Sequence, residues 1–173
     1  NLKYFLEAIM PTCHECDIKM AIHPDDPPWD IFGLPRLLVD EAAISRFLSM
    51  VDDPYNGLTL CSGSLGANRE NNIADIIRKY HDRIYFAHIR NVKHYENGDF
   101  SEVSHRDCDG DVGILDIVKA YYDCGFKGYI RPDHGRHIWN EQCRPGYGLY
   151  DRALGIMYIL GIWDILDKIK GEK

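Results

Sequence analysis

Short apolar runs alternate with longer amphipathic segments along the whole of this 173-residue chain. The short runs predict β-strands at residues 18–23, 58–61, 83–89 and 128–131. The amphipathic segments predict helices at residues 2–13, 40–50, 72–80, 114–124 and 151–170, the first ending near Pro11. Strands that alternate with helices pair in parallel through right-handed crossovers. The sequence therefore predicts an α/β fold built around four parallel strands.

Four parallel strands fit either a doubly wound sheet or half of a (β/α)8 barrel. A doubly wound nucleotide-binding sheet carries a glycine-rich phosphate loop after its first strand, and P-loop proteins carry a signature of their own. Neither pattern occurs in this sequence. Because a complete barrel usually needs about 200 residues or more, we expect residues 1–173 to form one half of a single barrel domain.

The composition restricts the partners and the compartment. The formal net charge is −7, whereas a nucleic-acid-binding surface needs a basic footprint. No apolar stretch reaches the roughly 18 residues of a membrane span, and the first residues lack the pattern of a secretory signal. Six cysteines beside eight histidines in a chain of this size favour a reduced protein. We therefore expect a cytoplasmic protein with neither a nucleic-acid nor a membrane partner.

Each predicted strand runs into a residue that can bind a metal ion. The four residues are His23, Cys61, His88 and Asp133. Side chains along a strand alternate between its two faces, and in every strand the candidate ligand lies opposite a pair of apolar residues. In a barrel the apolar face packs on the helices, and the inward residues converge at the C-terminal mouth, where active sites lie. We therefore expect the four side chains to share one metal site.

The donor types narrow the choice of ion. Imidazole, thiolate and carboxylate together suit Mn, Fe, Co, Ni or Zn better than Ca or Mg. Taken singly, each residue has a structural explanation: a strand-end histidine forms hydrogen bonds, Cys61 acts as a small buried hydrophobe, and Asp133 caps a turn. Their joint occurrence at matching positions of successive strands favours the metal site.

Two other features compete for a functional role. Cys13 and Cys16 form a CxxC pattern, which occurs in zinc and redox sites, but no second CxxC accompanies it. His105 lies in the longest predicted loop, and loops that follow barrel strands often contact the substrate. We therefore treat His105 as a candidate substrate-binding residue.

Five motifs together resemble one enzyme family: HPDDPP, CSGSLGA, HIRNVK, RPDHGR and RPGYGLYDRALG. The set resembles mannonate dehydratase of hexuronate (glucuronate) catabolism, of the type that uses Mn²⁺ or Fe²⁺. The resemblance implies a (β/α)8 TIM barrel in which this chain corresponds to the C-terminal half, roughly strands five to eight. It also implies dehydration of D-mannonate to 2-keto-3-deoxy-D-gluconate by a homo-oligomer, a dimer.

The resemblance also implies roles for individual residues. The metal ligands of the family match His23, Cys61, His88 and Asp133. Its catalytic pair matches His134 and Tyr147, although Tyr150 follows three residues later in the same motif.

The reaction needs a base and an acid. A proton leaves C2 of the sugar acid and a hydroxide leaves C3, so one group must accept a proton and another must donate one. We expect His134 and Tyr147 to divide these roles, in an order that the sequence leaves open. Arg90 follows His88 by two residues and is a candidate to pair with the substrate carboxylate, with a structural salt bridge as its alternative.

Two rival functions fit parts of the pattern. Metal-dependent sugar isomerases and epimerases of the xylose-isomerase-like group also gather ligands at a barrel mouth, but they usually use more carboxylates. Here no glutamate ends a predicted strand. The other rival is a metal-binding domain without enzymatic activity, which would hold a fully coordinated ion with no open position.

Overall fold

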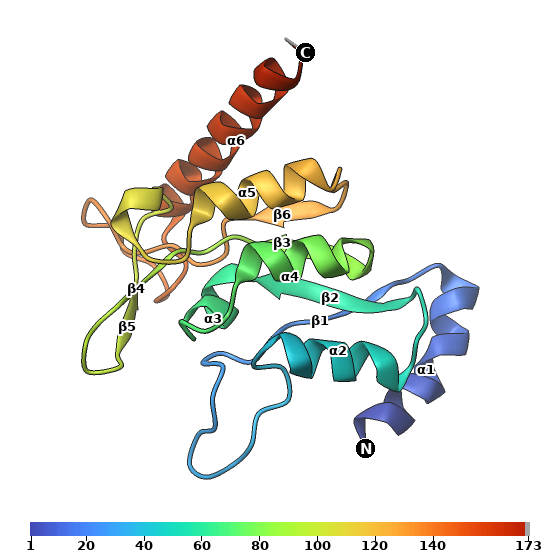
Figure 1. The fold of residues 1–173 in the computed structure, drawn as a ribbon. Helices are drawn as coiled ribbons and strands as arrows, with labels where there is room; N and C mark the ends of the chain where they lie inside the picture. The colour runs from blue at the N-terminus through green and yellow to red at the C-terminus, as the bar shows by residue number, and fades with distance from the viewer. Residues whose placement is uncertain (172–173) are drawn as a thin grey trace.

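A four-stranded parallel sheet forms the centre of the computed structural model, which describes residues 1–171 (Figure 1). Its strands, in their order across the sheet, are β1 (Met20–Ile22), β2 (Asn56–Cys61), β3 (Ile84–His88) and β6 (Tyr129–Arg131). Each strand is parallel to its neighbour and lies beside the strand that precedes it in this order. The predicted α/β class and parallel pairing are therefore confirmed.

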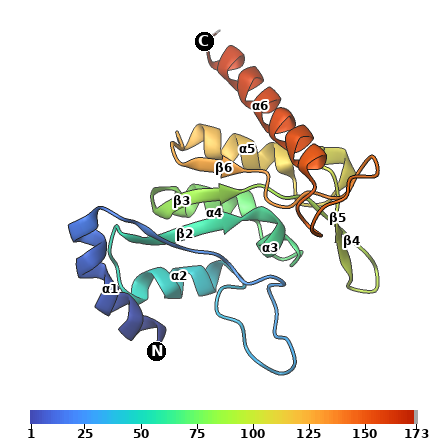
Figure 2. The same cartoon turned by 180° about the vertical axis from the view of Figure 1, so that it is seen from behind.

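Helices cover one face of this sheet. The longer ones are α1 (Leu2–Cys16), α2 (Glu41–Met50), α4 (Ile73–Tyr80), α5 (Ile114–Asp123) and α6 (Leu149–Gly171). Three short segments complete the set: α3 (Ser62–Gly66), η1 (His81–Arg83) and η2 (Asp107–Asp109). Figures 1 and 2 show α4 and α5 along the same side of the strands, as right-handed crossovers between adjacent strands require. No helix within residues 1–171 is long and apolar enough to span a membrane.

The strand register separates a covered face from an open one. Leu58 and Leu60 of β2 are buried beneath the helices, together with Ala87 of β3. On the other face, Cys61 pairs with His88, so these two side chains point to the same side. Tyr129 of β6 shares that side and is 84% exposed. The open face is thus the one that carries the residues predicted to bind a metal.

Two helices begin at the residues that the sequence indicates. The Asp40 side chain accepts a hydrogen bond of 2.7 Å from the backbone N–H of Ala43 at the start of α2. Asn72 accepts one of 3.1 Å from the N–H of Asp75 at the start of α4. These short side chains satisfy backbone donors that a helix leaves unpaired at its first turn.

The first helix is longer than predicted. Pro11 lies inside α1, which continues to Cys16 and ends at Asp17 in a left-handed conformation with φ 52°. Proline removes one helical hydrogen bond, but Met10 and Cys13 on either side of it are buried in the core. The packing of this face outweighs the local preference, so the predicted end at Pro11 was wrong.

The long segment between β3 and α5 contains a hairpin that we did not predict. Strands β4 (Val92–His94) and β5 (Phe100–Glu102) pair antiparallel around a turn that contains Asn97 and Gly98. The hairpin extends away from the central sheet (Figure 1). Asn-Gly is a strong hairpin signal, so the sequence did carry the information.

Candidate metal centre

The four predicted ligands come together at one edge of the sheet. Cys61 and His88 are the last residues of β2 and β3, His23 follows β1, and Asp133 follows β6. Parallel strands end at the same edge, so their C-terminal residues lie side by side. The donor atoms of His23, Cys61 and His88 all lie within 4.8 Å of one another.

Asp133 completes the group. Its carboxylate lies 3.4 Å from Cys61 Sγ through one oxygen and 3.2 Å from His88 Nδ1 through the other. The Asp133 backbone has a φ of 55°, a left-handed conformation that aspartate tolerates better than most residues. The turn after β6 therefore directs this carboxylate back toward the ends of β2 and β3.

The polar atoms of this cluster fit a bound cation. His88 Nε2 is buried without a hydrogen-bond partner in the described structure, and Nδ1 of the same ring faces the Asp133 carboxylate at 3.2 Å. The ring of His23 is already engaged at Nδ1, which lies 2.7 Å from the carbonyl oxygen of Pro24, so Nε2 is the nitrogen left for a ligand role. Buried polar groups without partners are costly. An ion between these donors would remove that cost.

The charge on Asp133 suits the same role. Burial alone would raise the pKa of the Asp133 carboxyl, but a hydrogen bond from His88 and the nearby charges of His134 and Arg90 outweigh it. The pKa of this carboxyl is therefore held well below its usual range. The group is an ionised, acceptor-only carboxylate at neutral pH.

The surroundings of Arg90 favour the structural one of its two predicted roles. Its side chain is buried, with one terminal nitrogen 2.6 Å from Asp26 and the other 3.1 Å from Glu102. Its Nε lies 3.6 Å from Asp133. The guanidinium is therefore enclosed by carboxylates of its own chain, which supports the structural alternative over pairing with a substrate.

His105, predicted to contact the substrate, is buried among backbone carbonyl groups. It is 4% exposed, and its Nε2 lies 2.8 Å from the carbonyl oxygen of Ile89 and 2.9 Å from that of Pro132. Ile89 follows the candidate ligand His88, and Pro132 precedes Asp133. The predicted substrate role is therefore not supported, and His105 instead joins the strand ends that carry two candidate ligands.

His134 and Tyr147 lie on adjacent backbone segments. Gly135, which follows His134, forms a β-bridge with Tyr147, and its N–H donates to the carbonyl oxygen of Gly146 at 3.0 Å. Tyr150, the alternative, lies in the first turn of α6, with its ring 5.6 Å from that of Trp139. The backbone arrangement therefore favours Tyr147 as the partner of His134.

Glu102 is a residue near the centre that the sequence did not reveal. Its carboxylate contacts Nδ1 of His134 as well as Arg90. The hydrogen bond to Glu102 raises the pKa of His134 despite the opposing effect of burial. A glutamate in a polar loop usually faces solvent, so no local signal distinguished this one.

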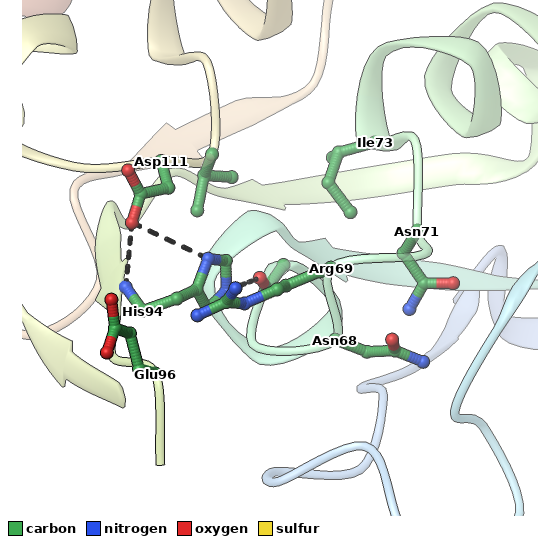
Figure 3. A pocket seen from close by; sticks show the side chains of 9 residues that line it. Asn68, Arg69, Asn71, Ile73, His94, Glu96 and Asp111 are labelled. Atoms are coloured by element: carbon green, nitrogen blue, oxygen red, sulfur yellow. Dashed lines mark hydrogen bonds and ion pairs between the residues drawn. The ribbon is translucent and has the colours of Figure 1, made fainter. Parts of the chain in front are cut away.

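A separate pocket lies away from the candidate metal centre. It has a volume of about 480 Å³ and is lined by Asn68, Arg69, Asn71, His94, Glu96 and Asp111, among others. Figure 3 shows His94 between Asp111 and Arg69. His94 is engaged by Asp111 and by the carbonyl oxygen of Gly66. The cation Arg69 is accompanied by two carboxylates, so the pocket has no excess of positive charge to hold an anion.

The CxxC pattern has no matching site among residues 1–171. Cys13 is packed into the core, and Cys16 is exposed. Among residues 1–171, the side chains grouped closely enough to bind one metal ion are those of His23, Cys61 and His88.

Known proteins resemble the chain over its whole length. The family model described as D-mannonate dehydratase (UxuA) matches residues 1–173. A mannonate dehydratase from Endomicrobium trichonymphae is 64% identical over 173 residues, which are 100% of this chain and 48% of that protein. The chain thus spans about half the length of the curated relatives that it matches. These matches do not support our expectation that the chain corresponds to the C-terminal half of the barrel. Its four strands are therefore not numbered as strands five to eight.

Solved structures resemble the fold as well. The crystal structure of mannonate dehydratase from Streptococcus suis serotype2 superimposes with a TM-score of 0.93 at 43% identity, covering 98% of this chain and 49% of that one. A D-tagatose 3-epimerase-like protein superimposes with a TM-score of 0.65 at 14% identity, covering 96% of this chain and 54% of that one. The second likeness concerns the fold alone.

Cys61→Ser is expected to lower the amount of transition metal bound per folded chain. A serine hydroxyl is a poorer ligand than a thiolate for such ions. The measurement is elemental analysis after equilibration with Mn²⁺ or Fe²⁺, with Cys16→Ser as a matched control at an exposed cysteine. Equal metal content in all three proteins would remove Cys61 from the ligand set.

His105→Ala is expected to lower the free energy of unfolding. The variant leaves the carbonyl groups of Ile89, which is buried, and Pro132, which is partly buried, without this donor, a loss of about 1–3 kcal/mol. Urea unfolding measures the change, and His137→Ala, at an exposed histidine, is the control. Unchanged stability together with a raised KM would restore the substrate role.

Proposed function

Because the chain belongs to the D-mannonate dehydratase family, we propose that it forms part of a metal-dependent hydro-lyase that converts D-mannonate to 2-keto-3-deoxy-D-gluconate. The observation that carries the proposal is the convergence of His23, Cys61 and His88 with Asp133 at one sheet edge. The acid–base candidate His134 directly follows Asp133. A site with ligands and a proton-transfer group side by side suits the removal of water.

We propose that His23, Cys61, His88 and Asp133 hold one divalent ion, Mn²⁺ or Fe²⁺. Such an ion, when bound, polarises substrate oxygens and offsets the negative charge that develops on them. The unpartnered Nε2 of His88 and the ionised Asp133 support this assignment. Mixed nitrogen, sulfur and carboxylate donors are typical of transition-metal sites.

His134 and Tyr147 are proposed to move the protons. One removes the proton from C2, and the other protonates the hydroxyl group that leaves C3. The close approach of their backbone segments supports the pairing. The guanidinium groups of Arg144 and Arg152 lie 5.2 Å and 5.7 Å from the centre of the half-exposed Tyr147 ring, and such a pair of cations favours an anionic ligand.

The four strands are proposed to belong to a (β/α)8 barrel. Three features support this inference: the strands follow one another in order, their helices share one face, and the other face carries the site. The free edges of β1 and β6 in the described region would then pair with further strands of the barrel. A dimeric state and a cytoplasmic location stay predictions.

The isomerase alternative differs in its product. Isomerisation conserves the mass of the sugar acid, whereas dehydration removes one molecule of water. The ligand set here contains one carboxylate, and the likeness to an epimerase-like protein concerns the fold alone. Mass spectrometry of the product of D-mannonate separates the two, and a product of unchanged mass would overturn the proposal.

His134→Gln is expected to lower kcat by about 10²–10⁴-fold, which is the usual contribution of a positioned acid or base. Glutamine keeps a polar side chain but cannot exchange a proton near neutral pH. The measurement is steady-state formation of the 2-keto-3-deoxy acid with the metal bound, and elemental analysis checks that the metal is retained. A kcat equal to that of the wild type would exclude His134 from the chemistry.

Tyr147→Phe is expected to reduce kcat strongly, whereas Tyr150→Phe leaves it within about twofold. Both variants lose one hydroxyl group from a half-exposed tyrosine, so each serves as the control for the other. Only Tyr147 lies on the segment that pairs with the backbone beside His134. The reverse order of effects would transfer the proposed role to Tyr150.

A further inference from the structure

Glu102 reaches His134 from a distant part of the chain. It is the last residue of β5, where its backbone pairs with that of Val92, a fully buried residue of β4. Just beyond it, the N–H of Val103 donates to the carbonyl oxygen of Asn91 at 3.2 Å. The buried side chain of Asn91 then donates to two further carbonyl groups of the same loop. The backbone that carries Glu102 is therefore held firmly on both sides.

The side chain of Glu102 is held as well. Arg90 donates to Glu102 Oε1 at 3.1 Å, and the opposite end of the same guanidinium donates to Asp26 at 2.6 Å. Arg90 is always charged and buried, so it needs these carboxylates. Gly63 permits this placement, because a Cβ there would lie 1.9 Å from Arg90 Nε. Glu102 thus has a fixed position before His134 is considered.

The contacts at His134 Nδ1 favour one arrangement of protons. This nitrogen contacts Glu102 Oε1 and lies 3.0 Å from Arg90 Nη1. If Nδ1 carried no proton, it could accept from Arg90 Nη1, but its lone pair would also face the lone pairs of the acceptor-only Glu102 carboxylate, its nearer neighbour. If Nδ1 carries the proton, the carboxylate oxygen accepts from both Arg90 and His134, and each donor is satisfied. The second arrangement is a charge-assisted hydrogen bond.

We propose that Glu102 is a positioning residue for the dehydration: it accepts the Nδ1 proton of His134, orients the ring, and leaves Nε2 as the nitrogen that exchanges a proton with the substrate. The expected effect on kcat rests on the proposed function. The hydrogen bond between Glu102 and His134 does not depend on that function. The two nitrogens of an imidazole are distinct, and the partner of one sets the state of the other. Glu102 acts through His134, and its carboxylate forms no hydrogen bond or ion pair with the candidate ligands in the described structure.

The test compares Glu102→Gln and Glu102→Ala in the full-length, metal-loaded enzyme. Both variants are expected to lower kcat by about 10- to 100-fold, the usual effect of removing an orienting partner, with KM within about threefold of the wild type. Glu96→Gln is the matched control, because Glu96 is an exposed glutamate in the turn of the same hairpin. Its kcat is expected to equal that of the wild type.

A spectroscopic measurement separates positioning from a general structural effect. Long-range ¹H–¹⁵N correlation spectra of the wild type are expected to show His134 protonated at Nδ1, and Glu102→Ala to shift the ring toward the other tautomer. An unprotonated Nδ1 in the wild type, or a kcat within twofold of it in both variants, would overturn the proposal. A loss of kcat in proportion to lost metal would also overturn it.

The failure of the wider proposal would look different. If the wild type dehydrated no sugar acid, the proposed function would be wrong. The ¹⁵N spectra would still report on the hydrogen bond between Glu102 and His134, so the two inferences can fail independently.

Discussion

The parallel pairing of β2 with β3 is the interaction on which the candidate site depends. Its register makes Cys61 the partner of His88, so a sulfur and an imidazole from separate strands meet on one face of the sheet. Their distance is therefore set by backbone hydrogen bonds between strands, which are more rigid than loop contacts. The loops after β1 and β6 then add His23 and Asp133 to this fixed pair.

A second layer of charge surrounds the candidate ligands. Arg90 occupies a buried position among Asp26, Glu102 and Asp133. A buried guanidinium is tolerated only when carboxylates surround it, and each carboxylate is in turn oriented by the arginine. The motifs HPDDPP and HIRNVK, which carry His23 and His88, are therefore also joined to each other by the ion pair between Asp26 and Arg90. This frame also holds Glu102 against His134.

The structure separates residues that act at the site from those that support it. His105 was predicted to contact the substrate because it lies in a long loop. It is buried instead, and its ring donates to the carbonyl groups that directly follow β3 and β6. The close approach of α6 explains the depth of its burial, since a Cβ on Gly155 would lie 2.4 Å from His105 Nδ1. Position in a loop predicts exposure only when no other element packs over that loop, and sequence alone does not reveal such packing.

The sequence by itself determined the alternation of strands and helices, the helix starts at Asp40 and Asn72, and the four residues that share one edge and face. These features follow from periodicity and capping, which act over a few residues. Only the tertiary structure decided that α1 passes through Pro11, that carboxylates enclose Arg90, that His105 is buried, and that Glu102 contacts His134. Those outcomes depend on contacts between residues far apart in the chain, and no local pattern records which distant charge a side chain will meet.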